Sequence, residues 1–207
     1  MNALILVDLQ NDFLPGGALA VPRGDEVIEI ANRLMPRFDI VAATQDCHPP
    51  DHLSFAREHA GKSVGDSIDL DGLPQVLWPV HCVAKTLGCE FPTRLQSALI
   101  TKVFPKGTDR RRDSYSGFYD NGGIVATGLA DYLQRVGVQD VYVMGLATDY
   151  CVRATAIDAA KLGLTTYLIE DGCRGVDLSP GDCDRAISEM EEAGVRPANS
   201  NEVPAVA

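Results

Sequence analysis

The chain has 207 residues, which is enough for one domain or at most two small ones. Hydrophobic residues make up 45% of it, alongside 19 Gly and 12 Pro, as is ordinary for a globular α/β protein. A formal net charge of −11 argues against a nucleic-acid or anionic-membrane partner. The one dense basic run, at residues 110–112, is flanked by aspartates, so we interpret it as a solvated loop.

Apolar runs and hydrophobic periodicity predict strands that alternate with helices. Continuous apolar runs, typical of strands buried on both faces, cover residues 3–7, 38–43, 99–104, 140–145 and 165–169. Helical periodicity covers residues 24–34, 127–136, 148–162 and 182–193. This alternation predicts parallel βαβ units and a doubly wound sheet of the α/β class.

Two segments lack a strong pattern. Residues 46–98 are rich in Pro and Gly and show no clear period, so we expect a long loop of the kind that usually carries function. Residues 196–207 are expected to form an edge or a frayed end.

The cysteines and the N-terminus bear on the cellular compartment. The first apolar run reaches the carboxylate of Asp8 too early for a signal peptide, and no run approaches the roughly 18 apolar residues of a membrane span. Six cysteines contain no Cys-x-x-Cys pair, which argues against zinc-finger and thioredoxin-like sites. We therefore expect a cytoplasmic protein whose cysteines are mostly reduced.

Three of the four histidines fall into a metal-ligand pattern. His48 and His52 follow Asp46 closely, and His81 comes after a Trp-Pro turn. Imidazole with one carboxylate suits zinc, iron or manganese, and the end of a strand is where α/β proteins place their sites. Two alternatives stay open: Asp51 could replace Asp46 as the carboxylate ligand, or the histidines could be polar loop residues.

Cys151 is the candidate nucleophile. The predicted strand ends at Gly145, and a helix is predicted to begin near Thr148 as its N-cap, which places Cys151 in the first helical turn. A helix N-terminus stabilises anions, so we expect the thiol to lose its proton more readily there and the free N–H groups to suit an oxyanion. The alternative is a small buried cysteine that only packs.

Other candidate site residues follow predicted strands or lie on predicted loops. Asp8 ends the first strand and could act as general base, or it could be a turn residue. Lys106 follows the third strand and could balance the negative charges of a carboxylate and a thiolate, or it could lie on the surface. Phe13, Trp78 and Tyr115 could wall a flat ring, or they could pack as ordinary core residues.

Taken together, these motifs resemble those of one family. The chain is similar to the nicotinamidases (pyrazinamidases) of the isochorismatase-like cysteine hydrolase superfamily, from the N-terminus to at least Val176. The segments that carry the resemblance are Val7-Asp-Leu-Gln-Asn-Asp-Phe13, Asp46-Cys-His-Pro49, Trp78-Pro-Val-His-Cys82, Phe104-Pro-Lys-Gly107, Asp113-Ser-Tyr-Ser-Gly-Phe118, Gly145-Leu-Ala-Thr-Asp-Tyr-Cys-Val-Arg-Ala-Thr155 and Asp171-Gly-Cys-Arg-Gly175.

The resemblance implies a fold and a catalytic centre. It implies a six-stranded parallel sheet flanked by helices, in a three-layer α/β/α domain that spans residues 1–207. It implies a catalytic triad of Asp8, Lys106 and Cys151, with an oxyanion hole formed by the backbone N–H groups of Ala147 and Cys151. It also implies a cis peptide bond between Leu146 and Ala147.

The resemblance further implies the residues that bind the metal and the substrate. One divalent ion, zinc first and iron or manganese otherwise, would be held by Asp46, His48, His52 and His81. The substrate ring would lie between Phe13 and Trp78, with Tyr115 and Tyr150 nearby. One departure is Cys47, where the family often has an aromatic residue; this could alter the pocket wall or add sensitivity to oxidation.

The implied activity is hydrolysis of nicotinamide to nicotinate and ammonia through a thioester at Cys151, as a step of NAD salvage. Pyrazinamide is an expected second substrate, and the metal is expected to orient the substrate ring through the ring nitrogen. Whether the protein forms a homo-oligomer stays open.

Three competing interpretations remain. An N-carbamoyl or ureido amidase of the same superfamily would keep the triad but lack the metal cluster. An isochorismatase acts on a vinyl ether and does not need the cysteine. A metal-stabilised interaction module would bury Cys151 as core, so that its thiol would react with iodoacetamide no faster than the others.

Overall fold

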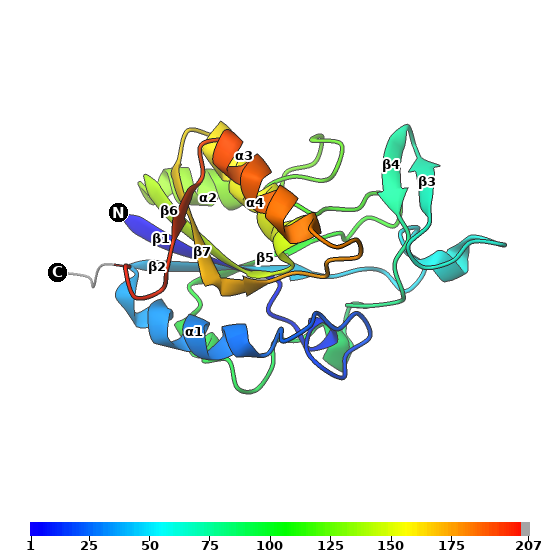
Figure 1. Cartoon of the computed structure of the whole chain (residues 1–207), viewed down its shortest axis with the longest axis horizontal. Helices are drawn as coiled ribbons and strands as arrows, with labels where there is room; N and C mark the ends of the chain where they lie inside the picture. The colour runs from blue at the N-terminus through cyan, green and yellow to red at the C-terminus, as the bar shows by residue number, and fades with distance from the viewer. Residues whose placement is uncertain (204–207) are drawn as a thin grey trace.

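A computed structural model describes residues 1–203 of the chain and shows three layers, with a central sheet between two sets of helices (Figure 1). The sheet has six strands in the order β5-β2-β1-β6-β7-β8, and every pairing in it is parallel. The strands are β1 (Asn2–Val7), β2 (Ile40–Asp46), β5 (Lys102–Lys106), β6 (Asp140–Leu146), β7 (Thr165–Arg174) and β8 (Arg196–Ala198). The predicted doubly wound parallel sheet is confirmed.

Helices cover both faces of this sheet. Helix α1 lies on one face, while α2, α3 and α4 lie on the other (Figure 1). Their bounds are α1 (Glu26–Leu34), α2 (Leu129–Arg135), α3 (Arg153–Lys161) and α4 (Asp182–Glu192). Helix α1 buries its apolar stripe of Val27, Ile28, Ala31 and Leu34 against the sheet, which accounts for its periodicity.

The strand order reverses at β1, which pairs with β2 on one side and β6 on the other. Such a reversal opens a crevice at the carboxyl ends of the strands. Asp8 follows β1, Asp46 ends β2, Lys106 ends β5, and Cys151 lies just beyond β6. The topology therefore brings four candidate side chains to one edge of the sheet.

Several predicted element boundaries shift, among them that of the second strand, which runs from Ile40 to Asp46 and not over residues 38–43. The third strand, predicted at residues 99–104, runs instead from Lys102 to Lys106, because β5 is an edge strand where Pro105 is tolerated. Strand β7 extends beyond its apolar run to Arg174. The predicted helix at 148–162 is divided into a π-helical turn, η6 (Thr148–Val152), and α3. Thr148 is not the N-cap; Ala147 occupies that position without a side-chain cap.

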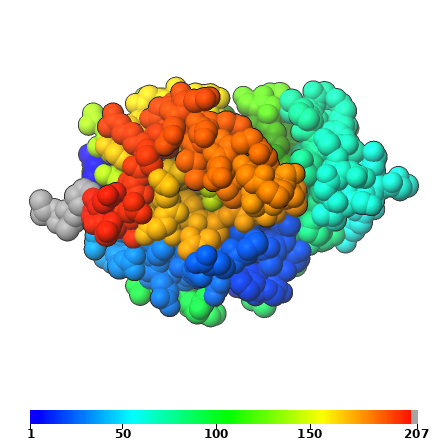
Figure 2. Space-filling model, viewed as in Figure 1, coloured from blue at the N-terminus to red at the C-terminus, as the bar shows by residue number. Residues whose placement is uncertain are grey.

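The prediction of one long loop at residues 46–98 is wrong in part. It contains an antiparallel hairpin of β3 (Ser67–Leu70) and β4 (Leu73–Val76), which projects at one end of the molecule with the segment around it (Figure 2). Asp71 and Gly72 form its turn with φ values of 56° and 85°, as a tight Asp-Gly hairpin requires. The strands are short and mostly exposed, so they leave no apolar run in the sequence, although the Asp-Gly pair is a turn signal.

The chain's last segments complete the sheet. Strand β8 pairs in parallel with β7 at the sheet edge, which agrees with the expected edge; residues 204–207 of the predicted tail lie outside the described part of the chain. Among residues 1–203, the helices are all too short or too polar to cross a bilayer.

Candidate active site

A buried lysine joins the candidate catalytic residues. Lys106 Nζ lies 2.9 Å from Oδ2 of Asp8, 2.7 Å from Oδ1 of Asp46 and 3.4 Å from Sγ of Cys151, and it also donates to the carbonyl of Ser114 at 2.8 Å. The Lys106 side chain is fully buried. The structure thus brings the three expected triad residues into contact, and it links them to the metal cluster through Asp46.

The two carboxylates beside Lys106 have opposite pKa shifts. Burial raises the pKa of Asp8 above its ordinary value of 3.8, although Lys106 opposes the shift. Burial acts on Asp46 as well, but there Lys106 and His48 outweigh it and hold the pKa well below 3.8. Two neighbouring acids with pKa values driven apart divide their roles, because one stays ionised and the other can carry a proton. These directions favour an ionised Asp46 and an Asp8 that can take up a proton.

Cys151 is buried, and its environment differs from the one expected from its helical position. Burial raises the pKa of its thiol well above the ordinary value of 9.0, and the nearby ammonium of Lys106 only partly opposes this. The expected lowering of the pKa by the helix N-terminus is therefore wrong. Sγ and one oxygen each of Asp8 and Asp46 lie within 4.8 Å of one another. A thiol with a raised pKa needs an adjacent base to form its thiolate.

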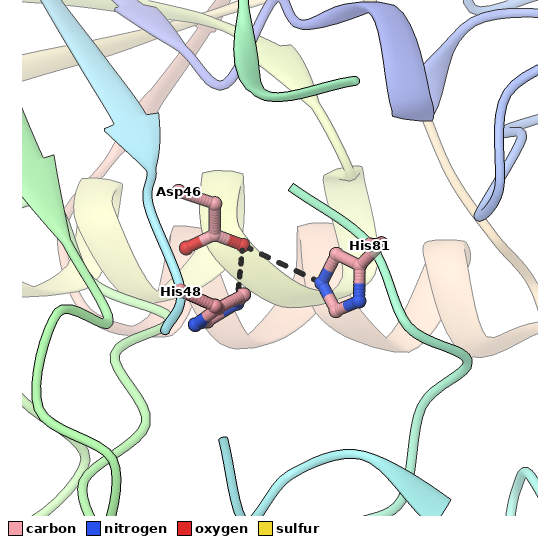
Figure 3. A group of neighbouring side chains, drawn as sticks. All are labelled: Asp46, His48 and His81. Carbon is pink, nitrogen blue, oxygen red and sulfur yellow. Dashed lines mark ion pairs between the residues drawn. The ribbon is translucent and has the colours of Figure 1, made fainter. Parts of the chain in front are cut away.

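Three of the four expected metal ligands converge. Nε2 of His48 and Nε2 of His81 lie 3.5 and 3.7 Å from the same Oδ2 of Asp46 (Figure 3). Asp46 ends β2, and the loops that carry the two histidines are paired, since the N–H of His48 donates to the carbonyl of Cys82 at 3.0 Å. These separations allow one ion to bind all three atoms at about 2 Å each.

The second ring nitrogen of His48 and of His81 is held by a backbone carbonyl, which orients each ring for metal binding. Nδ1 of His48 lies 2.9 Å from the carbonyl oxygen of Gly107, and Nδ1 of His81 lies 2.8 Å from that of Pro79. A carbonyl only accepts, so each Nδ1 carries a hydrogen, and Nε2 is the ring nitrogen that faces Asp46 and is left for an ion. Metal-binding histidines have this arrangement of partners. The donors of Asp46, His48 and His81 therefore fit a divalent cation.

The fourth expected ligand does not join this group. His52 packs beside the ring of His48, but its Nδ1 faces the Ser54 hydroxyl at 2.7 Å and its Nε2 lies 3.3 Å from the Arg112 carbonyl. Asp51, the alternative carboxylate, is exposed and pairs with Arg110. Asp46 is therefore the carboxylate of the cluster.

An apolar cavity with an empty volume of about 380 Å³ opens onto Cys151. All four expected aromatic residues line it: Phe13, Trp78, Tyr115 and Tyr150. Trp78 Nε1 donates to the Tyr115 hydroxyl at 3.2 Å, which fixes both rings. Asp46 and His81 also reach the cavity, so a ligand on the thiol can meet the metal donors.

Three further lining residues were not expected from the sequence: Leu19, Asp113 and Val176. Asp113 belongs to a motif that carried the family resemblance and accepts a hydrogen bond from Gln75 Nε2 at 2.7 Å. Leu19 and Val176 come from irregular segments, where no period or motif marks them.

The backbone at the end of β6 carries Ala147, one of the two residues expected to form the oxyanion hole. Ala147 lines the cavity, and the peptide bond between Leu146 and Ala147 is cis, as the resemblance implies. Cys47, the departure from the family pattern, is not among the described residues that line this cavity.

The isochorismatase domain family matches residues 2–202. The nicotinamidase of Escherichia coli (strain K12) is 48% identical over 197 residues, which cover 93% of this chain and 92% of the relative. A nicotinamidase/pyrazinamidase structure from Acinetobacter baumanii has a TM-score of 0.95 at 43% identity and covers 98% of both chains.

Two further solved structures are described with a ligand. Yeast nicotinamidase bound to the inhibitor nicotinaldehyde has a TM-score of 0.90 at 32% identity, covering 96% of this chain and all of that one. Pyrazinamidase of Pyrococcus horikoshii in complex with zinc has a TM-score of 0.77 at 40% identity, covering 96% and 98%. The chain therefore belongs to the isochorismatase family and, within it, to the nicotinamidase group.

Proposed function

We propose that this protein hydrolyses nicotinamide to nicotinate and ammonia, with Cys151 as nucleophile. The observation that carries the proposal is the buried contact of Asp8, Lys106 and Cys151 on an aromatic-lined cavity, beside three convergent metal donors. Nicotinamide offers a flat apolar ring for the cavity, a ring nitrogen for the metal site and a carboxamide carbon for the thiol.

The first half of the reaction forms a thioester. Asp8 takes the proton of Cys151, for which its raised pKa suits it. The thiolate sulfur then forms a bond to the carboxamide carbon, and the carbonyl oxygen becomes an oxyanion that the N–H groups of Ala147 and Cys151 stabilise. Protonated Asp8 returns its proton to the leaving nitrogen, the C–N bond breaks, and ammonia departs.

The second half releases nicotinate. Asp8, ionised again, takes a proton from water, and the resulting hydroxide attacks the thioester carbon. The C–S bond breaks, and the sulfur leaves as a thiolate that recovers its proton from Asp8. Lys106 stays charged throughout, because the adjacent Asp46 and Asp8 overcome burial and raise its pKa well above 10.5.

Asp46, His48 and His81 would hold one divalent ion, zinc in the first place and iron or manganese as alternatives, whereas His52, the fourth ligand that the family resemblance implies, faces Ser54 and the Arg112 carbonyl. When bound, this ion supplies a Lewis-acidic contact for the ring nitrogen of the substrate. Phe13 and Trp78 enclose the ring, and Tyr115 and Tyr150 close the wall. The similar ring of pyrazinamide makes it a second substrate.

The physiological role proposed is NAD salvage in the cytoplasm. All six cysteines are free thiols, which agrees with a reducing compartment.

Ammonia release tests the proposed function. Purified protein with bound metal is offered nicotinamide, pyrazinamide and N-carbamoylsarcosine in parallel. We expect release from the two ring amides and none from the carbamoyl compound, and we expect the rate on nicotinamide to fall when a chelator removes the metal. Release from N-carbamoylsarcosine alone would contradict the substrate assignment, and full activity without metal would contradict the role of the ion.

A further inference from the structure

Thr44 lies where β1 and β2 stop pairing. The two strands pair from Ala3 and Ile40 as far as Leu6 and Ala43. Beyond that point the β1 chain turns, and Asp8 adopts a φ of 50°, in the left-handed region that a residue with a side chain rarely occupies. Something other than the strand ladder must hold Asp8, and Thr44, fully buried on β2, lies beside it.

The hydroxyl of Thr44 makes two hydrogen bonds with the same residue. It accepts the backbone N–H of Asp8 at 3.2 Å and donates its own hydrogen to Asp8 Oδ1 at 2.6 Å. A hydroxyl can donate and accept at once, whereas an apolar side chain can do neither. Thr44 therefore holds both the backbone and the carboxylate of Asp8.

This contact makes the two oxygens of Asp8 unequal. Oδ1 is occupied by Thr44, while Oδ2 forms the ion pair with Lys106 at 2.9 Å. Oδ2 is fully buried and accepts no well-aligned hydrogen bond within residues 1–203. One carboxylate oxygen of Asp8 lies within 4.8 Å of Sγ of Cys151. An oxygen with spare accepting capacity is suited to receive the thiol proton, so the orientation of the carboxylate decides whether transfer from Cys151 is direct.

We infer that Thr44 is a positioning residue for the reaction, which holds the Asp8 carboxylate so that Oδ2 exchanges the proton with Cys151. The inference rests on the proposed function for the role of Asp8. Thr44 is not among the described residues that line the cavity, so it acts through Asp8 and not on the substrate.

Two substitutions separate the hydroxyl from the methyl group of Thr44. Thr44→Val removes the hydroxyl and keeps the γ-methyl. That methyl packs closely against Gly117, where an added Cβ atom would lie only 2.6 Å from it. Thr44→Ser keeps the hydroxyl and removes the methyl. If only packing mattered, Thr44→Ser would be the more damaging change; positioning predicts the reverse.

The measurements are kcat and KM for nicotinamide, together with the rate at which iodoacetamide alkylates Cys151. For Thr44→Val we expect kcat to fall about 10- to 100-fold, the order that a misplacement of about 1 Å costs, with KM changed less than about threefold. We expect alkylation of Cys151 to slow about tenfold, because thiolate formation depends on the same proton transfer. Thr44→Ser should stay within about threefold of the wild type in both assays.

Thr166→Val is the matched control, because Thr166 is also buried in the sheet but donates to the Leu164 carbonyl at the opposite end of the strands; its kcat should match the wild type. Thr44→Ala replaces Thr44→Val if the latter does not fold. Wild-type kcat and alkylation rates without the hydroxyl, or equal losses in Thr44→Ser, would overturn the inference. A wild type that releases no ammonia from nicotinamide would refute the proposed function alone, and the alkylation rates would still decide the role of Thr44.

Discussion

Replacing Lys106 by methionine removes one positive charge from a site that holds two carboxylates. The Lys106 and Asp8 side chains are fully buried and that of Asp46 is 6% exposed, so water cannot replace the ammonium. Removing one partner of a buried ion pair costs about 3–5 kcal/mol of folding free energy, because the other charge is left uncompensated. For a chain of this length that corresponds to a Tm lowered by roughly 6–20 °C.

The loss should depend on pH in a defined direction. The lowered pKa of Asp46 stabilises the folded wild type at pH values above 3.8, and that contribution is lost as the pH falls below it. In Lys106→Met both carboxyl groups lack their counter-ion, so their pKa values rise and protonation relieves the repulsion. The gap in stability between wild type and variant should therefore narrow from pH 7.5 to pH 5.

Thermal unfolding at the two pH values measures this, on proteins with matched metal content. Lys102→Met is the control, since Lys102 lies on the same strand β5 but is exposed, where it faces the ring of Tyr132 at 5.0 Å. It should lose at most about 1 kcal/mol. A Tm for Lys106→Met that equals that of Lys102→Met, or a gap that widens toward pH 5, would refute the reasoning.

Three further predictions concern the metal, the ring and the base. His81→Ala should lose bound metal in dialysis while His52→Ala keeps most of it, because of these two histidines His81 faces Asp46 and His52 does not. Equal metal losses, measured by atomic emission, would restore His52 as a ligand. Phe13→Ala should raise KM for nicotinamide roughly 10- to 100-fold through lost ring contact, and an unchanged KM would remove Phe13 from the pocket wall. The kcat/KM profile should fall on acidification with a midpoint above 3.8, because burial raises the pKa of Asp8 and the protonated acid cannot accept the thiol proton; full activity down to pH 4 would show that another group is the base.

The parallel sheet was predictable because its strands are buried on both faces and leave continuous apolar runs, as Ala3 to Val7 do in β1. The ends of those runs also located Asp8 and Lys106, because strand ends in this topology share one edge. The hairpin at residues 67–76 could not be found in the same way, since its strands are mostly exposed and only Asp71-Gly72 marks it.

The site was predictable in composition and less so in detail. The spacing of Asp46, His48 and His81 identified the metal donors, but the sequence cannot show that the ring of His52 turns toward the Arg112 carbonyl. Burial of Cys151 raises its pKa, whereas its helical position predicted a lowered pKa. The sequence could not show this, because desolvation depends on residues that pack against the thiol from distant segments. The Thr44 contact to Asp8 has no local signal either, since it joins residues 36 positions apart.

The central claim is that Cys151 forms a thioester with the substrate. Acid quenching during turnover of nicotinamide, followed by intact-mass and peptide mass spectrometry, tests it most directly, with Cys151→Ala as the control. We predict that the quenched wild type carries the added mass of one nicotinoyl group on the peptide that contains Cys151, and that the variant carries none and releases no ammonia. Turnover by Cys151→Ala, or a nicotinoyl group on another residue, would contradict the account.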